Sequence, residues 1–426
     1  MRFFASLISK RETLDDLQAI GVGKKKYGNI FSALPREIVT VILGFLDKRF
    51  MLLSVSLVCR QFRKYCMDPG CWISISYRRQ RNLAVIFSKF HNIARSLRLQ
   101  YALITENTAV YFPHLTTLYL GTTGVPSHMK RSEQFHERFI SLHAQQLKKL
   151  SLKGTSLNWR NFPQFSFPNL HKLSLSKGTE LHISSDTLLH LCSLYNTSEW
   201  SSKLKHLSLR GLSDISNDCV KQVLSSCTAL QYLSIQDCQT LTGEIFAQFD
   251  PVHIHTFKLR VIGDQEGFQP EQLEQLFRKM KKLKHLKVVR VSAFDSSTIQ
   301  ALVEQGVKLE QLNLQYCSDF TDFSAELIAQ CCTESLCVLI IENLPLSHEA
   351  LNLWLSKLKM LQRLSVFSIK PFNDATLQQI VANCNLLYFL RLYGLQVTDD
   401  GMKYLVGCSE LGRLFVSECP NLTLAS

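Results

Sequence analysis

Cysteine and histidine are the side chains of this sequence best able to ligate a metal or attack a substrate. The chain has 426 residues, with 14 cysteines and 13 histidines. Cys331 and Cys332 are adjacent, but they have no matching pair and no histidine at zinc-ligand spacing. His253 and His255 alternate along a predicted strand, which indicates a metal only weakly. The sequence also has no G-x-S-x-G, H-E-x-x-H or Walker motif. We therefore expect a non-catalytic chain with no metal site and no cofactor.

Lysine and arginine indicate a second chemistry, the binding of anions. Eleven basic residues occupy alternating positions of thirteen short leucine-rich segments, and Glu342 is the one acidic residue at equivalent positions. The eleven are Arg98, Lys149, Lys153, Lys172, Arg210, Lys258, Arg260, Lys287, Arg363, Arg391 and Arg413. Residues 161–426 contain 23 basic and 26 acidic residues, so the basic bias belongs to these positions and not to the region as a whole. Basic side chains on one face would attract acidic or phosphorylated groups.

The elements that carry these residues are repeats of one short unit. The template L-x-x-L-x-L recurs as LKHLSL from Leu204 and LGRLFV from Leu411, for example, at intervals of 24 to 29 residues from Leu204 onward. Each copy predicts a short strand followed by a helix, as Leu377 and Ile380 at helical spacing indicate. Because one unit cannot bury its own apolar edge, neighbours must stack. We predict an α/β fold over residues 94–426: a right-handed leucine-rich-repeat solenoid, or horseshoe, with a parallel concave sheet and outer helices.

The cysteines fall into regular positions of this repeat. Cys227, Cys384 and Cys408 stand three residues before a repeat leucine, whereas Cys238, Cys317 and Cys419 follow a repeat's second leucine by five residues. Such positions suit a reduced thiol that packs as a small apolar group. We therefore expect a reducing compartment, cytoplasmic or nuclear or both. The sequence VTDDGMKYLVGC, ending at Cys408, resembles the cysteine-containing class of leucine-rich repeats.

The inner strands of such a solenoid are where we expect a protein substrate to bind. Aromatic residues join the basic ones there toward the C-terminus, at Phe367, Tyr393 and Phe415. Arginine and aromatic side chains together are typical of contact hot spots. The candidate substrate-binding residues are these three aromatics and all the basic positions above except Arg98. The alternative interpretation is that lysine and arginine only keep an exposed sheet soluble.

The segment Leu34–Trp72 differs from the repeats and predicts three short helices before Trp72. Its order of residues resembles an F-box. The matching positions are Leu34, Pro35, Glu37, Ile38, Ile42, Leu46, Val58, Cys59, Arg60, Phe62, Asp68 and Trp72. Three features depart from the family. Phe50-Met51 replaces the acidic residue that commonly opens the second helix, the loop before that helix is one residue longer, and Phe62 stands where tryptophan is usual.

An F-box followed by such repeats resembles an F-box/leucine-rich-repeat protein. The resemblance implies a substrate receptor of a Skp–cullin–F-box ubiquitin ligase, whose partners are a Skp-family adaptor, through it the cullin and RING subunits, and a protein substrate. It implies adaptor contacts at Leu34, Pro35, Ile38, Leu46, Val58 and Cys59. The domains expected are an N-terminal tail at 1–30, expected to be flexible, an F-box at 31–77, a linker or helical cap at 78–93, and about thirteen repeats at 94–426.

Several alternatives stay open on sequence alone. The first helices could be a cap of an interaction scaffold without ubiquitin chemistry. The basic face could also bind nucleic acid, although no nucleic-acid motif supports this. We expect no membrane partner, since the chain has no apolar run of transmembrane length. The insertions at 121–138 and 158–167 are either lids over the concave face or tolerated loops.

Overall fold

The structure is a computed structural model of the whole chain. It describes residues 34–44, 46, 48, 51, 55–58, 60–78, 83–100, 110–121, 138–154, 167–177, 201–213, 215–262 and 267–423. The chain divides into two compact units, Met1–Ile73 and Ser74–Ser426. The predicted tail at 1–30 and the two predicted insertions lie outside the described residues, except for Gly121, Arg138 and Phe167 at their ends.

The first unit contains short helices held by the residues that close it. The helices are α3 (Arg36–Gly44), α5 (Ser56–Val58), α6 (Arg60–Cys66) and the 3₁₀ helix η3 (Pro69–Trp72). Trp72 is fully buried, and its indole N–H donates to the Cys66 carbonyl at 2.8 Å. Asp68 accepts the Gly70 N–H at 2.9 Å and pairs with Arg36 at 2.6 Å. Asp68 therefore caps η3 and ties it to α3.

The second unit is one parallel sheet whose strands follow chain order. Its five-residue strands are β1 (Ser74–Arg78), β2 (Ser96–Gln100), β3 (Thr117–Gly121), β4 (Lys149–Lys153), β5 (Lys172–Ser176), β6 (His206–Arg210), β7 (Tyr232–Gln236), β8 (Thr256–Arg260), β9 (His285–Val289), β10 (Gln311–Gln315), β11 (Val338–Glu342), β12 (Arg363–Phe367), β13 (Phe389–Tyr393) and β14 (Arg413–Ser417). Every neighbouring pair is parallel. The predicted leucine-rich-repeat solenoid is thereby confirmed.

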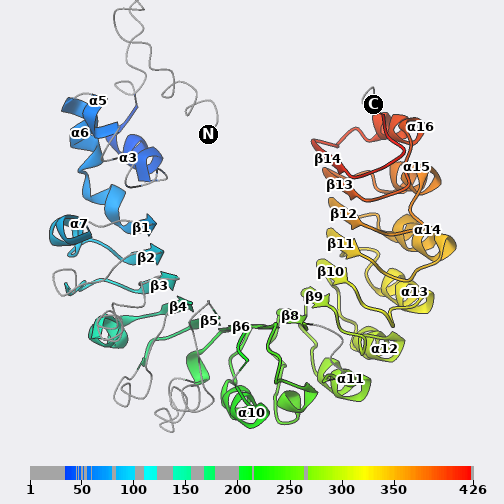
Figure 1. The fold of residues 1–426 in the computed structure, drawn as a ribbon, viewed down its shortest axis with the longest axis horizontal. Helices are drawn as coiled ribbons and strands as arrows, with labels where there is room; N and C mark the ends of the chain where they lie inside the picture. The colour runs from blue at the N-terminus through cyan, green and yellow to red at the C-terminus, as the bar shows by residue number, and fades with distance from the viewer. Residues whose placement is uncertain are drawn as a thin grey trace, which may run out of the picture. The chain divides into compact units, whose positions relative to one another are not determined.

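The helices lie on the outer side of the curved sheet of this unit (Figure 1). They are α7 (Leu83–Phe90), α10 (Asn217–Ser226), α11 (Pro270–Phe277), α12 (Ser296–Glu304), α13 (Asp322–Cys331), α14 (His348–Lys357), α15 (Asp374–Asn383) and α16 (Asp399–Lys403). The 3₁₀ helices η5 (Ala144–Gln146), η7 (Ser201–Lys203), η8 (Gly243–Phe246) and η9 (Tyr404–Gly407) complete the connections. Among the described residues, no helix is long and apolar enough to cross a membrane.

The core lies between the strands and these helices. Each strand places its second and fourth residues inward toward the helices, as Leu390 and Leu392 do at 0% exposure. In register, Leu390 pairs with Leu364 on one side and Leu414 on the other. Leu414 is 42% exposed, because β14 is the last strand of the sheet within the described residues. The stacking of neighbours, rather than any single repeat, therefore buries the leucines.

A recurring acidic residue links successive repeats on the helical side. Asp374, in the first turn of α15, accepts both the N–H and the hydroxyl of Thr398, at 2.8 and 2.6 Å. Asp399 makes the same two contacts with Thr423, at 3.0 and 2.6 Å. Thr398 in turn caps α16. The threonine–aspartate phrase of the repeat thus stabilises its own helix and the start of the next.

Two features differ from the sequence prediction or refine it. The sheet contains β1, a strand before the predicted repeats. This strand was not predicted from the sequence, because its sequence SISYR lacks the leucine template. The region predicted as a linker or cap at 78–93 contains α7. The cysteines of the repeat positions are buried, except that Cys408 is only half-buried. Burial raises the pKa of Cys227 to about 12, as expected for thiols that act as packing groups.

Candidate interaction surfaces

The first unit exposes apolar side chains that a folded domain would ordinarily bury. Ile38 and Val41 on α3 are 47% and 58% exposed, and Leu57 and Val58 on α5 are each 65% exposed. The opposite side of α3 is buried through Val39 and Leu43. We call Ile38, Val41, Leu57 and Val58 the exposed F-box side chains. Sequence reasoning selected Ile38 and Val58 but missed the other two, because helical spacing alone does not say which apolar residues the core takes.

The other predicted adaptor-binding residues are less uniform. Pro35 is exposed, whereas Leu34 and Leu46 are half-buried. Cys59 lies outside the described residues. Adaptor binding at all six positions stays a prediction.

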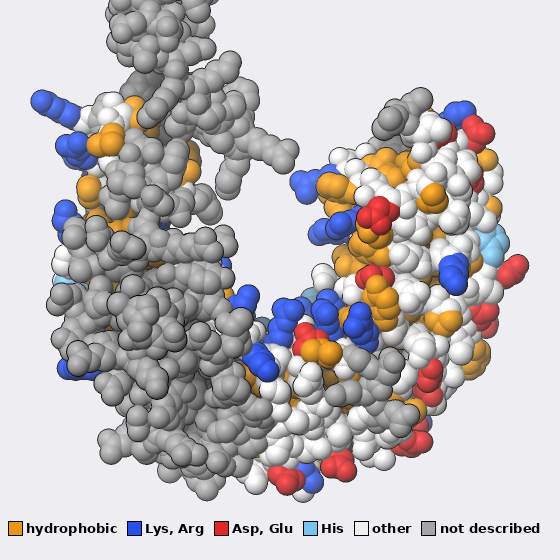
Figure 2. Space-filling view, viewed as in Figure 1, with side chains coloured by type: hydrophobic (Ala, Val, Ile, Leu, Met, Phe, Trp, Pro, Cys, Tyr) orange, Lys and Arg blue, Asp and Glu red, His pale blue; other side chains and the backbone are white. Residues whose placement is uncertain are grey.

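In the second unit, the predicted substrate-binding residues all occupy the first, third or fifth position of a strand. The basic ones are on β4 to β6, β8, β9 and β12 to β14, and the aromatic ones are on the last three of these strands. Figure 2 shows lysine and arginine gathered on the inner side of the sheet, with acidic side chains mainly on the outer, helical side. The strand period therefore places them on one face, and their binding role stays a prediction.

The first group of basic residues is Lys149, Lys172, Lys258 and Lys287, which we call the lysine cluster. Burial lowers the pKa of Lys172, and the charges of Lys149 and Lys258 lower it further. Burial also lowers the pKa of Lys287, with further lowering by Arg260, Lys258 and Arg210. Like charges are thus held near one another at partly desolvated positions, so an arriving anion would relieve their repulsion.

His206 and Tyr232 lie on β6 and β7, between Lys172 on β5 and Lys258 on β8. Their rings stack with centroids 3.7 Å apart and planes 13° apart, because β6 and β7 pair them in register. Lys258 Nζ lies 5.1 Å from the Tyr232 ring centroid. Burial, followed by Lys172 and Lys258, lowers the pKa of His206 to about 3. The His206 imidazole is therefore neutral at pH 7. His206 was not among the candidate site residues selected from the sequence.

Asp237 is an acidic residue at this face that sequence reasoning missed. It directly follows β7 in the left-handed conformation, with φ +58°, which aspartate tolerates better than most residues. Its carboxylate lies 3.0 Å from Arg260 Nε and 3.6 Å from Arg210 Nε. No other basic residue of the concave face forms an ion pair within the part of the chain that the structure describes. Asp237 thus partly neutralises two arginines, and among the described residues no lysine of the lysine cluster forms an ion pair.

The second group combines arginines with aromatic rings on β12, β13 and β14. We call it the arginine–aromatic cluster; its members are Arg363, Arg391, Arg413, Phe367, Phe389, Tyr393 and Phe415. The Arg363 guanidinium lies 4.8 Å from the Phe389 ring centroid, and that of Arg391 lies 5.2 Å from Phe367. The ring centroids of Phe389 and Phe415 are 5.4 Å apart. The register that pairs Arg363 with Phe389 and Arg391 with Phe415 produces this alternation.

Among the described residues, no group of three or more His, Cys, Asp or Glu side chains is placed to hold a metal ion. The adjacent thiols of Cys331 and Cys332 lie 3.2 Å apart at the end of α13.

Comparison with known proteins gives a family match for residues 31–78 and a structural likeness for most of the chain. Residues 31–78 match the family described as F-box-like. The chain is similar in structure to one chain of the Rad7 and Elc1 complex in yeast, with 13% identity, coverage of 91% of this chain and 95% of that chain, and a TM-score of 0.54. It also matches an internalin (inlF) of Listeria monocytogenes, with 16% identity, 88% coverage of each chain and a TM-score of 0.40. At these identities the first likeness shows the fold alone, and the second carries no argument.

The short helices of the first unit, the matched family and the parallel sheet of stacked repeats agree with one another. Residues 31–78 therefore match the F-box-like family, and the strands β1 to β14 form a leucine-rich-repeat solenoid.

Proposed function

We propose that this chain is the substrate-recognition subunit of a cullin–RING (SCF-type) ubiquitin ligase. The observation that carries the proposal is the F-box-like domain whose Ile38, Val41, Leu57 and Val58 side chains are exposed. Burying the remaining exposed surface of such side chains against a partner contributes about 1 kcal/mol each. A Skp-family adaptor is the partner to which an F-box binds, and the adaptor brings the cullin and RING subunits.

The repeats, in this proposal, hold the protein to be ubiquitinated. Their basic concave face suits an acidic or phosphorylated segment, because arginine can bind a phosphate through two parallel hydrogen bonds. The chain itself is non-catalytic and contributes position and effective concentration of the substrate. The reduced, buried thiols fit work in the cytoplasm or nucleus.

Adaptor binding can be tested with charges placed on the exposed F-box side chains. We expect the double variant Ile38→Asp/Val58→Asp to lower affinity for a recombinant Skp-family adaptor about 100-fold, because each carboxylate loses hydration in an apolar contact. Leu353→Asp/Val406→Asp is the matched control. It changes the same class of side chain, 46% and 89% exposed, on the repeats. Titration calorimetry measures both affinities.

The outcome also separates this function from that of a scaffold without ubiquitin chemistry. A scaffold whose first helices are only a cap would bind no adaptor, in the wild type or in either variant. Equal binding by the wild type and the F-box variant would contradict the proposed contact surface. Reconstituted ubiquitination of a captured substrate, present with the wild type and absent with the F-box variant, would support the complete proposal.

A further inference from the structure

The basic residues of the concave face are divided by two strands without any lysine or arginine on that face. β10 presents Gln311, Asn313 and Gln315, and β11 presents Val338, Ile340 and Glu342. The lysine cluster ends before them at β9, and the arginine–aromatic cluster begins after them at β12. The carboxylate of Glu342 accepts a hydrogen bond from the Tyr316 hydroxyl at 2.8 Å. β10 and β11 therefore place no cationic side chain on this face, and the basic residues on either side of them form two groups.

The two groups have different chemistry. The lysine cluster is polar: serine occupies the central position of β4 and β5, at Ser151 and Ser174, and of the neighbouring β6, at Ser208. Such a surface provides point charges and hydroxyls for a group of closely spaced negative charges. The arginine–aromatic cluster offers guanidinium groups together with partly exposed rings, of which Phe415 is 52% exposed. That combination binds an apolar or aromatic side chain that has a carboxylate beside it.

The strand spacing sets how far apart a single ligand must place these two features. From β9 to β12 there are three strand intervals, and from Lys258 on β8 there are four. At about 4.8 Å for each interval the separation is roughly 14 to 19 Å, and an extended peptide advances about 3.3 Å per residue. About four to six residues therefore span it.

We infer that the concave face recognises a two-part protein segment: a dense anionic group in the lysine cluster and, about four to six residues away, an aromatic residue with an acidic neighbour in the arginine–aromatic cluster. This inference rests on the proposed function, in which the concave face holds the substrate. Phosphates and a run of carboxylates both supply the anionic group. The segment crosses the strands, with its middle over the uncharged β10 and β11.

Synthetic peptides can test the two-part requirement by fluorescence anisotropy on the full-length chain. The reference peptide joins two phosphoserines, a glycine–serine spacer of about five residues and a Phe-Glu-Phe-Glu block, in both chain orders. A second peptide has glutamates in place of the phosphoserines, and two further peptides each contain one block only. We expect the reference peptide to bind at least about tenfold more tightly than either block alone, because the second contact is intramolecular. A one-residue spacer cannot span the strands and should remove this gain.

Variants in each cluster test which block of the peptide binds to which part of the concave face. We expect Lys258→Gln/Lys287→Gln to weaken binding of the phosphoserine block about tenfold and to leave the Phe-Glu block unchanged. Arg363→Gln/Arg391→Gln should do the reverse, and the reference peptide should respond to both. Lys359→Gln/Lys370→Gln removes the same charge at exposed positions off the concave face and serves as the control. Thermal melts confirm that each variant is folded.

Three results would overturn the inference. One is equal weakening of both single-block peptides by both cluster variants, which would mean one continuous field. Another is full affinity with the one-residue spacer. The third is a single-stranded oligonucleotide that binds more tightly than every peptide and displaces it. Ile38→Asp/Val58→Asp should bind the peptides normally. If the wild type does not bind the adaptor, only the proposed function is contradicted. If the wild type binds the two-part and the single-block peptides equally well, only this inference is contradicted.

Discussion

His143 shows how one buried side chain can take the place of backbone hydrogen bonds. It is 0% exposed, and its Nδ1 lies 2.6 Å from the Phe139 carbonyl oxygen. Its Nε2 accepts the Phe112 N–H at 2.9 Å. Both contacts are made at once only by a neutral ring with its proton on Nδ1. His143 therefore joins the segment before β3 to the helical turn before β4, provided that it stays uncharged.

Acid should weaken the fold through this histidine. Burial lowers the pKa of His143 in the folded protein, so below about pH 6.5 the unfolded chain binds a proton that the folded chain does not. Stability is then complete above that pH and falls as the pH decreases, by at most about 1.4 kcal/mol at pH 5.5. We expect thermal melts to show a smaller difference between pH 7.5 and 5.5 for His143→Gln than for the wild type.

A comparison variant is needed because His206 shifts in the same direction. Its pKa is lowered to about 3, so it too should add to the loss of stability in acid. His206→Gln should reduce the pH dependence as well, and the double variant should reduce it more than either single one. Parallel melting curves for the wild type and both single variants across this pH range would show that neither histidine is responsible.

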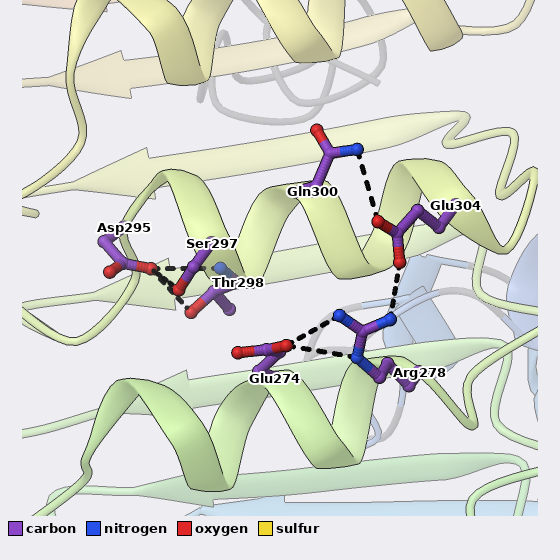
Figure 3. A network of polar contacts seen from close by, with 7 residues as sticks. All are labelled: Glu274, Arg278, Asp295, Ser297, Thr298, Gln300 and Glu304. Atoms are coloured by element: carbon purple, nitrogen blue, oxygen red, sulfur yellow. Dashed lines mark hydrogen bonds and ion pairs between the residues drawn. The ribbon is translucent and has the colours of Figure 1, made fainter.

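At the scale of the helix, caps and surface ion pairs occur side by side between α11 and α12 (Figure 3). Asp295 is the N-cap of α12, and its Oδ1 accepts the Thr298 N–H at 3.0 Å and the Ser297 hydroxyl at 2.8 Å. Arg278, on the exposed surface, pairs with Glu274 at 2.7 Å and with Glu304 on the next helix. The cap orders the first turn of α12, whereas the ion pairs compete with water.

The two interactions should therefore differ in their contribution to stability. We expect Asp295→Ala to lower the free energy of unfolding by about 1–2 kcal/mol, because the first turn of α12 loses its acceptor. Arg278→Ala should cost less than about 1 kcal/mol, since its carboxylate partners remain hydrated. Urea unfolding followed by circular dichroism measures both variants. A larger loss for Arg278→Ala than for Asp295→Ala would contradict this ranking.

The elements could be predicted from the sequence wherever one repeat specifies its own structure. The leucine template predicts β2 to β14 and the face of each strand residue, because period-two alternation is local. It did not predict β1, whose inward residues are Ile75 and Tyr77 rather than leucines. The pairing of Asp237 with Arg210 and Arg260 was also missed, because it depends on β6 to β8 lying in register. Interactions between repeats are thus the part of the fold that could not be predicted from the sequence of one repeat.

The F-box segment illustrates a different limit. Order of residue types identified it and named Ile38 and Val58 among the expected adaptor contacts, and both side chains are exposed. Val41 and Leu57 were not selected, although they are exposed to a similar or greater extent. Which apolar side chains of a short helix are buried depends on the packing of the neighbouring helices, and the pattern does not contain that information.

At the scale of the whole molecule, the two proposed binding surfaces differ in the force that would hold a partner. The exposed F-box side chains are aliphatic, so adaptor binding would depend on removal of apolar surface from water. The concave face is positively charged, and of its basic residues only Arg210 and Arg260 form ion pairs with other described residues. Binding there would depend on charge. The same chain should therefore respond to salt in two different ways.

Ionic strength should separate the two contacts. Between about 50 and 500 mM NaCl the screening length falls from roughly 14 to 4 Å, shorter than the lysine cluster is wide. We expect affinity for the two-part phosphopeptide to fall at least about tenfold over this range and affinity for the adaptor to change less than about twofold. Calorimetry with each ligand measures both. Lys258→Gln/Lys287→Gln should make the peptide's salt dependence shallower. Equal salt dependence of adaptor and peptide binding would contradict the assignment of charge to one surface and apolar contact to the other.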